Sequence, residues 1–492
     1  MKIRPPWAAI LCVTVCWPAW SLDLSQSYQA ALAQDPTILG VRAATDARRE
    51  RVPQTNAQLL PNLSLGLTRN HNALESTTPN FLGTPVTSNT DYTSSNQTLT
   101  LRQPLFNRYR SADQRQAQAQ VEDAEAILER ELQSLAVRVC SAYFEALLGT
   151  ENLALVQAQH ATVMHQLDAA RKRFIAGVGT RTDIDEAQAA LDLNAAQELE
   201  ARQNLEFTRR QLQNLVNQPV EPLATLDAGR LLLLPPTPDR LTDWTELAEM
   251  KSPEIRSLKA QVEAARQEVE KARSGNYPTL DAIAQWSRSE SDSVTNVNSR
   301  YNNSSLGLQL SLPIYSGGYV GATVRQTQAD QARLEYALEA MRRDLGVRVH
   351  REFRGVTEGV LRIRALEQAL RSAEQLVLSN RRSFEAGSRT LNDALNAEQQ
   401  KVSAQRDLAM ARYTYLLSRV RLQALAGAPM LELVEELNRW LVAKVPPSAV
   451  RPVETDAGLP LKAVSELRLR PPKVNAYGPS VTAPPLGIKA LD

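Results

Sequence analysis

Two long stretches of this chain contain no proline, residues 105–218 and residues 314–428. Each follows a short segment of alternating apolar and polar residues that ends in a proline, and these two prolines lie 209 residues apart. Each stretch also contains the motif Phe-X-Ala-Gly, at residues 174–177 and 384–387, 210 residues apart. An internal repeat constrains a fold more strongly than length does. We therefore predict one body built from two repeats, where 492 residues alone would suggest roughly three domains.

Both proline-free stretches have the residue spacing of long amphipathic helices. Apolar residues recur every three or four positions over residues 121–146 and again over residues 334–360, which is the pattern of a helix that buries one stripe. From Tyr109 to Lys172 the pattern is nearly unbroken, and at about 1.5 Å per residue this corresponds to about 100 Å of helix. A compact domain does not need a helix of that length.

Glycines interrupt each stretch and mark a turn. Gly177 and Gly179 lie in the first stretch and Gly387 in the second, and the helical pattern resumes after each turn. We therefore predict two long helical hairpins, at residues 108–217 and 318–426. The repeats that contain them are residues 22–220 and residues 241–428.

A pair of predicted strands precedes each hairpin. Apolar and polar residues alternate in all four segments, as in strands with one apolar face, and each segment is about as long as a membrane-spanning strand. The Ser-, Thr- and Asn-rich segments inside each pair, residues 76–96 and 289–305, are predicted to be solvent-exposed loops. The predicted strands are residues 60–70, 97–105, 278–288 and 306–315.

Alternation by itself is also typical of sheets in soluble proteins, so these strands alone do not establish a membrane location. Four strands cannot close a barrel, and an open sheet edge is not viable in lipid. If the strands cross a membrane, several chains must share one barrel. Three chains would supply twelve strands, which is within the known range.

The N-terminus has the features of a secretory signal peptide over residues 1–21. Lys2 and Arg4 precede a short apolar run, and a small-residue cleavage site precedes Leu22. Cys16 follows residues that make a poor lipobox, and its lipidation is left open. Removal of the signal leaves Cys140 as the one remaining cysteine, which excludes an internal disulfide.

The charge balance and the remaining segments restrict the possible partners. The net charge of +2 falls to about zero once Lys2 and Arg4 are removed, which argues against a nucleic-acid partner. No segment after the signal is apolar enough for a transmembrane helix. Residues 221–240 are predicted to be a linker and residues 429–444 a short helix. Residues 445–492 contain nine of the chain's 27 prolines and are predicted to be a disordered tail.

No pattern in the chain points to catalysis or to a cofactor. His160 and His165 are five residues apart, on different faces of a helix, and make a poor metal pair. Residues 183–186 carry three acids but lack the glycine and the ligand spacing of an EF-hand. The nucleophile-elbow, phosphate-loop and dinucleotide motifs are absent from the sequence. We predict that the protein is not an enzyme and has no cofactor or metal.

The remaining polar cluster lies at the two predicted turns. Thr182 and Asp183 follow the first turn, and Arg389 and Asp393 lie in the second. One interpretation is helix capping, in which Thr182 or Asp183 accepts hydrogen bonds from first-turn amides. The other is that these side chains face the narrow end of a central passage. The two interpretations are compatible.

Together these features resemble the TolC family of outer-membrane efflux and secretion ducts, over residues 22–428. The most specific matching segments are residues 306–318, with the sequence LGLQLSLPIYSGG, and residues 384–393, with the sequence FEAGSRTLND. The first repeat matches at residues 142–146 and 173–177.

The resemblance implies a mixed α+β fold, mainly α. In such a fold three chains build a twelve-stranded β-barrel in the outer membrane of a Gram-negative bacterium. A long α-helical barrel continues from it across the periplasm and is closed at its far end by an iris of helix tips. The implied partners are two further copies of the chain, outer-membrane lipid, a periplasmic membrane-fusion adaptor protein and an inner-membrane RND or ABC transporter. The implied function is the exit duct of a tripartite efflux pump or of a type I secretion system.

The resemblance also implies roles for side chains near the turns. Asp393 matches the family's luminal acidic ring, and Arg389, Asp183 and Thr182 match residues whose bonds hold the iris shut.

The chain departs from the family pattern at two of these positions. Asn396 stands where a second acidic ring is common, and Phe384 stands where a tyrosine is a common bonding partner. The departures predict a ring that attracts cations less strongly and a closed state that is latched more weakly.

The alternative interpretation is an exported periplasmic coiled-coil scaffold or adaptor-type protein that binds partners through its helical seams. It accounts for the long helices but not for the four strands or the hydroxyl-rich segments between them. Heat-modifiable migration and membrane fractionation would distinguish the two. No motif in the sequence identifies the cargo, or separates drug efflux from protein secretion.

Overall fold

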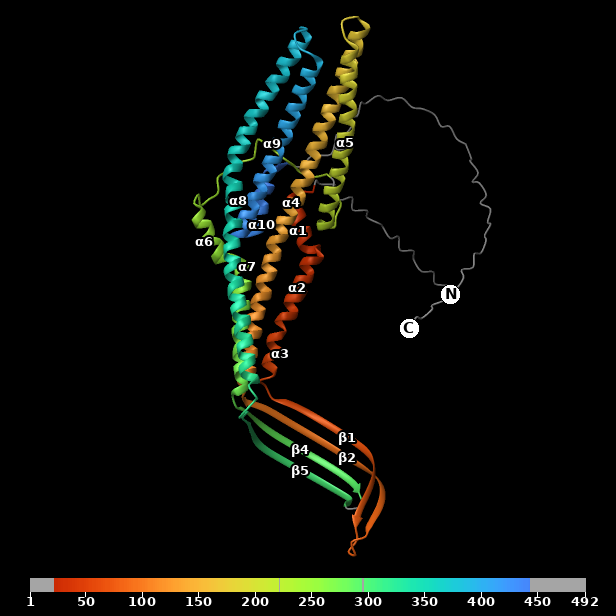
Figure 1. The fold of residues 1–492 in the computed structure, drawn as a ribbon, viewed down its shortest axis with the longest axis vertical. Coiled ribbons are helices and arrows are strands. Elements are labelled where there is room, and N and C mark those ends of the chain that lie inside the picture. Colours follow the sequence, from red (N-terminus) through yellow and green to blue (C-terminus); the bar gives the residue numbers. More distant parts are fainter. Residues whose placement is uncertain (1–21, 221, 294–295, 443–492) are drawn as a thin grey trace, which may run out of the picture. The chain divides into compact units, whose positions relative to one another are not determined.

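The computed structural model describes residues 22–220, 222–293 and 296–442 (Figure 1). The predicted signal peptide with Cys16 and the predicted tail at residues 445–492 lie outside the described residues. Helices make up most of the described chain. Their bounds are α1 Leu24–Gln34, α2 Pro36–Arg49, α3 Arg51–Ala57, α4 Arg108–Ile175, α5 Arg181–Val216, α6 Leu241–Lys251, α7 Pro253–Arg273, α8 Tyr319–Glu385, α9 Leu391–Leu425 and α10 Met430–Asn438.

Two helical hairpins run side by side in this arrangement (Figure 1). The first joins α4, of 68 residues, to α5, of 36 residues. The second joins α8, of 67 residues, to α9, of 35 residues. At about 1.5 Å per residue the longer arm of each hairpin measures about 100 Å. Within the described residues, no helix is both long and apolar enough to cross a membrane.

Four strands form one antiparallel sheet in the order β1-β2-β4-β5. The register places apolar residues opposite each other, because Leu65 pairs with Leu99, Leu99 pairs with Trp286, and Ala282 pairs with Leu308. Side chains alternate between the two faces of a sheet, so one face is apolar across all four strands. That face is uncovered, since Leu65 is 63% exposed and Leu308 is 70% exposed. The strand bounds are β1 Asn62–Pro79, β2 Pro85–Phe106, β4 Thr279–Ser293 and β5 Asn296–Ser311.

The strands extend beyond the predicted ones, so the prediction of solvent loops at residues 76–96 and 289–305 was wrong over most of both segments. β1 and β2 stay paired as far as Pro79 and Pro85. The prediction relied on Ser, Thr and Asn content, and a ribbon that is polar on both faces has no apolar alternation to reveal it. Threonine is β-branched and fits a strand well.

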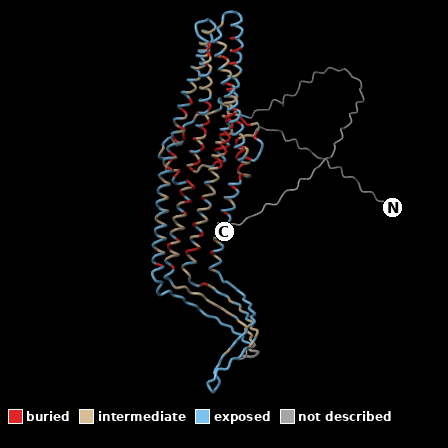
Figure 2. The backbone as a smooth tube through the Cα atoms, turned by 45° about the vertical axis from the view of Figure 1, so that its right-hand side comes forward, coloured by how far each residue is buried: buried red, intermediate tan, exposed pale blue. Residues whose placement is uncertain are grey.

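The main apolar core lies midway along the long helices, where buried residues gather in Figure 2. Tyr143 of α4 is fully buried there. Its hydroxyl shares its one proton between two carbonyl oxygens, those of Leu22, at 3.1 Å, and Ala224, at 3.0 Å. Short elements surround this residue: α1, α10 and the two-stranded sheet of β3 (Thr225–Leu226) with β6 (Leu441–Val442). We call these four the lateral elements.

The lateral elements also correct the prediction of one short helix over residues 429–444. The helix α10 ends at Asn438, and residues 441–442 form a strand. The partner strand lies in the predicted linker, more than 200 residues earlier in the chain. A local pattern could not show this pairing.

The shorter arm of each hairpin ends against another helix. After α9 the chain passes through Gly427, which has a positive φ of 67°. A Cβ added there would lie 2.9 Å from the carbonyl oxygen of Lys251, so only glycine fits this close approach. The end of α9 therefore lies beside the junction of α6 and α7. In the first half of the chain, Asn217 after α5 donates to Gln34 before α2, at 3.0 Å.

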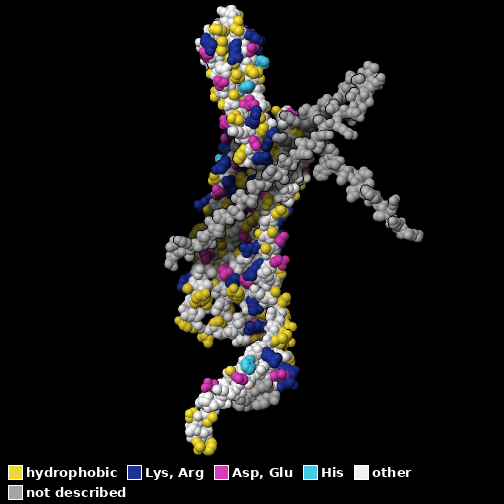
Figure 3. All heavy atoms as spheres, turned by 90° about the vertical axis from the view of Figure 1, so that its right-hand side faces the viewer, with side chains coloured by type: hydrophobic (Ala, Val, Ile, Leu, Met, Phe, Trp, Pro, Cys, Tyr) yellow, Lys and Arg dark blue, Asp and Glu magenta, His cyan; other side chains and the backbone are white. Residues whose placement is uncertain are grey.

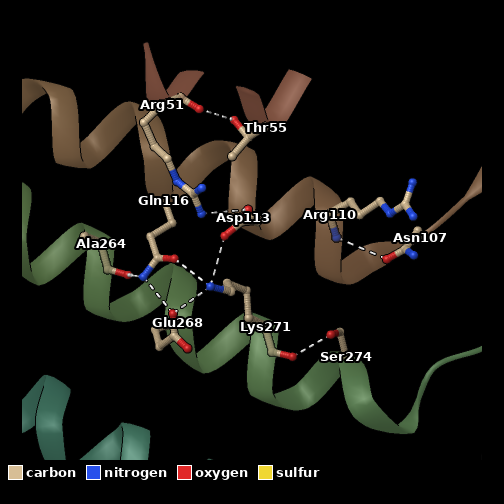
Figure 4. Close-up of polar contacts among 10 residues, drawn as sticks. All are labelled: Arg51, Thr55, Asn107, Arg110, Asp113, Gln116, Ala264, Glu268, Lys271 and Ser274. Atoms are coloured by element: carbon tan, nitrogen blue, oxygen red, sulfur yellow. Dashed lines mark hydrogen bonds and ion pairs between the residues drawn. The ribbon is translucent and has the colours of Figure 1, made fainter. Parts of the chain in front are cut away.

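A polar cluster joins α3, α4 and α7 near the point where the helices meet the sheet (Figure 4). The buried carboxylate of Asp113 lies 3.0 Å from Lys271 Nζ and 3.4 Å from Arg51 Nη2. Lys271 Nζ also lies 3.0 Å from Glu268 Oε2 and donates to Gln116 Oε1 at 2.8 Å. Burial lowers the pKa of Lys271, but the hydrogen bonds to Glu268 and Asp113 outweigh it, and the pKa is raised overall. Each buried charge is thus paired, as burial requires.

Candidate functional site at the helical hairpin turns

Both hairpin turns end the longer helix with the same backbone pattern. A glycine with positive φ follows each helix, Gly177 at 78° and Gly387 at 75°. The amide of the next residue donates to a carbonyl oxygen five residues earlier, at 3.0 Å in the first turn and 2.9 Å in the second. This hydrogen bond is typical of a Schellman motif, which satisfies carbonyl groups at a helix end. Glycine is required because a side chain would be strained at this φ.

Both returning helices begin with the same side-chain cap. In the first, the Asp183 amide donates to Thr180 Oγ1 at 3.1 Å, and the Thr180 amide donates to Asp183 Oδ2 at 2.9 Å. In the second, the Asp393 amide donates to Thr390 Oγ1 at 3.2 Å, and the Thr390 amide donates to Asp393 Oδ2 at 3.0 Å. Each pair is a capping box that satisfies two amides lacking helical partners. The capping interpretation is confirmed for Asp183, although the N-cap residue is Thr180 and not Thr182.

The predicted gate residues lie exposed or half-buried around these caps. Arg389 Nη1 lies 3.7 Å from Asp393 Oδ1 in the same chain. The side-chain Nδ2 of Asn396 donates to Asn392 Oδ1 at 3.2 Å, and Thr182 is exposed in the first turn of α5. Among the described residues of one chain, the ion pair of Arg389 is with Asp393 and not with Asp183. A bond between Arg389 and Asp183 would therefore have to join neighbouring copies.

The hydrogen bonds at the second cap affect the charge of Asp393. The Thr390 amide, the Thr390 hydroxyl and then the Arg389 guanidinium lower the pKa of this carboxyl. The carboxylate therefore stays ionised at neutral pH.

A small apolar core links the two hairpins just behind the turns. Its buried members are Leu167 and Ala170 of α4, Ala187 of α5 and Leu391 of α9. Phe384 of α8 packs against it.

Phe384, which replaces the tyrosine expected from the family pattern, has a specific partner in this position. The guanidinium of Arg173 lies 4.5 Å from the centre of the Phe384 ring, within the range of a cation–π contact. A cavity of about 540 Å³ lies next to this pair, lined also by His165, Arg381 and Glu385. Arg173 of the first hairpin therefore contacts the second hairpin through the Phe384 ring, which has no hydroxyl group with which to form a hydrogen bond.

Sequence reasoning missed three residues of this site, Thr180, Thr390 and Arg173. The two threonines carry a readable signal, because Thr-X-X-Asp is a capping-box pattern. Arg173 carries none, because its contact with Phe384 joins residues far apart in the chain. Within the described ranges, no group of three or more His, Cys, Asp or Glu residues is placed to hold a metal ion. Figure 3 shows basic and acidic side chains mixed over the helical end that carries the turns.

Comparison with known proteins identifies the family. The model of the family described as outer membrane efflux protein matches residues 27–218 and 244–428. The alkaline protease secretion protein AprF of Pseudomonas aeruginosa is 34% identical over 455 residues, which cover 91% of this chain and 93% of AprF. The proteases secretion protein PrtF of Dickeya chrysanthemi is 30% identical, over 86% of this chain and 92% of PrtF.

Solved structures agree on the fold. The outer-membrane channel OprN aligns with a TM-score of 0.71 at 18% sequence identity, over 83% of this chain and 90% of OprN. The fold is therefore the mixed α+β, mainly helical fold of outer-membrane channels, as predicted. Because the family model covers more than half of the chain, this chain belongs to the outer membrane efflux protein family, and the predicted TolC-like channel of the outer membrane is confirmed.

Proposed function

We propose that three copies of this chain form the exit duct of a protein secretion system. One observation carries the proposal: a four-stranded sheet with an uncovered apolar face is joined to two helical hairpins whose longer arms each span about 100 Å. The sheet has the chemistry of a lipid-facing surface, and the helices have the length of a periplasmic tunnel.

The apolar face supports membrane insertion and a shared barrel. Leu63, Leu65 and Leu67 of β1 are 63–70% exposed, and Leu306 and Leu308 of β5 are 70–83% exposed. In water this face would be unfavourable, at about 25 cal/mol per Å² of apolar surface. In lipid it is favourable only if the backbone groups along both edges of the sheet are paired. The edge strands β1 and β5 of neighbouring copies would pair, and twelve strands from three copies would close the barrel.

The hairpin turns would form the gate at the periplasmic end of the duct. Arg389 is exposed at the second turn and Asp183 is half-buried at the first, so each is available to a neighbouring copy. Arg389 would bond to Asp183 and Thr182 of the adjacent hairpin and latch the closed state. Phe384 cannot donate a hydrogen bond, and the latch would be weaker for that reason. Asp393 would line the passage, and Asn396 would add no charge to it.

The cargo is proposed from two relatives of the chain. The names of AprF and PrtF assign both to the secretion of proteases. By analogy this duct would receive a polypeptide from an inner-membrane ABC transporter through a periplasmic adaptor protein, as in type I secretion. Efflux of small molecules with an RND transporter is the second candidate, supported by the description of the family.

Two experiments test the proposal. In the first, the mass of the purified protein in detergent is measured together with ion conduction in planar bilayers, with a conducting trimer as the expected result. In the second, the gene is deleted in its native host and the proteins in the medium are compared with the parent strain. Loss of specific secreted proteins with unchanged drug sensitivity supports secretion, whereas drug hypersensitivity with an unchanged medium supports efflux. A stable monomer that does not conduct would contradict the duct itself.

A further inference from the structure

A groove lined by arginines lies halfway along the helices, where the end of α9 meets the start of α7. Its volume is about 290 Å³, and its walls come from α4, α7, α8 and α9. The charged residues that line it are Arg130, Arg348, Arg351, Arg421, Glu254 and Glu352. Four arginines against two glutamates make the lining basic overall.

The ion pairs inside the groove leave part of this positive charge free. Arg348 is bonded to Glu254 through both Nη atoms, and its Nε lies 2.8 Å from Asp344. Arg130 pairs with Glu131 at 2.7 Å.

Two of the four arginines are not neutralised. In the described part of the chain, Arg351 and Arg421 take part in no ion pair within 4.0 Å, and both are exposed. Glu352 lines the groove without an ion pair as well, so one carboxylate opposes two free guanidinium groups.

The groove lies on the side of the helices that faces away from the lateral elements. On α4, Val139 lies one turn before Tyr143, whose hydroxyl contacts Leu22 and Ala224 beside the lateral elements. Arg130 is nine residues before Val139, about two and a half turns at 3.6 residues per turn and so on the opposite side. On α8, Arg351 lies between Val349 and Phe353, both of which are buried in the main core, so Arg351 lies on the opposite side of α8 from this core. In a barrel of helices the lateral elements must lie outside, since they would obstruct the passage. The groove then faces the passage.

We propose that this groove, repeated three times around the passage, binds acidic side chains of a polypeptide in transit. The inference rests on the proposed duct function. The planar fork of an arginine matches a carboxylate with two parallel hydrogen bonds. The free arginines are exposed, so each contact is weak and screened by salt. Weak and repeated contacts suit a passage, because a passenger must enter and also leave.

The test measures the block of single channels by an acidic peptide in planar bilayers. Unstructured poly-glutamate peptide is added to wild type and to the double variant Arg351→Gln/Arg421→Gln. The variant should need about fivefold to tenfold more peptide for the same block, as expected when two exposed ion pairs per copy are lost. The matched control is Arg230→Gln/Arg240→Gln, which removes the same charge from exposed positions in the segment between β3 and α6. The peptide should block this control variant at the same concentration as wild type.

Further measurements separate the possible outcomes. An unchanged block in a double variant that still conducts would overturn the proposal. Inorganic phosphate that blocks wild type as strongly as the peptide, at matched charge, would show a small-anion site and would also overturn it. If wild type does not conduct, the duct function fails. Binding in the groove is then tested separately by the fluorescence anisotropy of labelled peptide mixed with the detergent-solubilised protein. Equal binding by wild type and the double variant would overturn the proposed peptide site.

Discussion

The two hairpin turns share a backbone design but differ in the side chains they display. Both end a long helix with a positive-φ glycine, and both begin the returning helix with a Thr–Asp capping box. The residue before the capping threonine is Gly179 in the first turn and Arg389 in the second. The residue after it is Arg181, which is exposed, in the first turn and Leu391, which is 2% exposed, in the second.

The comparison separates what builds a turn from what a turn can do. The caps are needed wherever a helix starts, so they recur in both turns. The residues beside them are free to differ: the first turn carries its exposed arginine, Arg181, after the capping threonine, whereas the second carries Arg389 before it and the buried Leu391 after it. Gly179 could not carry such a side chain at no cost, because a Cβ there would lie 3.0 Å from the Phe174 amide nitrogen. The second turn therefore supplies the arginine of the proposed latch, and the first turn supplies the partners proposed for it, Asp183 and Thr182.

The largest difference in stability between the two turns is expected when the side chain that follows the capping threonine is truncated to alanine. Leu391→Ala removes a buried side chain from the small core behind the turns and should destabilise the start of α9 by about 2 kcal/mol. Arg181→Ala, at the matching position, removes a side chain that forms an exposed ion pair with Asp185 at 3.2 Å, and should cost at most about 0.5 kcal/mol. Hydrogen exchange of the first-turn amides measures both. Equal exchange in the two variants would show that the small core does not stabilise the turn.

The caps should respond equally in the two turns. Thr180→Ala and Thr390→Ala each remove an N-cap hydroxyl and should destabilise the helix start by about 1 kcal/mol. Thr162→Ala is the control, because the Thr162 hydroxyl bonds to the Ala158 carbonyl inside α4 and caps no helix start, and it should leave the exchange of these amides unchanged. If hydrogen exchange shows that one cap variant loses clearly more stability than the other, the capping box does not stabilise both helix starts equally.

The proposed latch depends on the residue before the second capping threonine. Arg389→Ser should raise single-channel conductance, because each lost link is worth about 0.2–1 kcal/mol and three copies repeat it. Arg381→Ser is the matched control, since Arg381 forms an exposed pair with Glu385 within α8, at 3.5 Å. If the assembled Arg389→Ser trimer conducts like wild type, Arg389 does not latch the closed state, and helix capping is the remaining role of this turn.

The smallest effect is expected at Asp393, which already serves as a cap. Asp393→Asn should reduce cation selectivity and block by multivalent cations, because a carboxylate ring concentrates cations in a narrow pore. The amide oxygen can still accept the Thr390 hydrogen bond and preserve the cap. Reversal potentials in a salt gradient measure the change, and Asp183→Asn provides the corresponding variant of the first turn.

The same carboxylate predicts a pH dependence. Its pKa lies below the ordinary value of 3.8, so the carboxylate is charged above that pH and its contributions to capping and selectivity are complete there. Both should be lost only as the pH falls through the lower pKa of the folded state. Selectivity should therefore be constant from pH 7 to pH 5 and should decline below about pH 4. A midpoint above 3.8 would indicate that the three carboxylates repel one another more strongly than Thr390 and Arg389 stabilise them.

Local patterns were sufficient for the long helices, the turns and the strand segments that have one apolar face. A helix that buries one stripe must repeat every three or four residues, a positive φ requires glycine, and a strand with one apolar face must alternate. Each of these rules relates residues that are close in sequence. The short segments at residues 306–318 and 384–393 were likewise enough to identify the family.

Tertiary structure alone decided which distant residues meet. It paired the polar ends of β1 with β2, which had no apolar alternation to reveal them, and it paired β3 with β6 across more than 200 residues. It set Arg173 over Phe384 and brought Arg130, Arg351 and Arg421 from three helices to one groove. The physical reason is that such contacts depend on how long helices pack side by side, and a repeat of three or four residues specifies which face is buried but not which neighbour covers it.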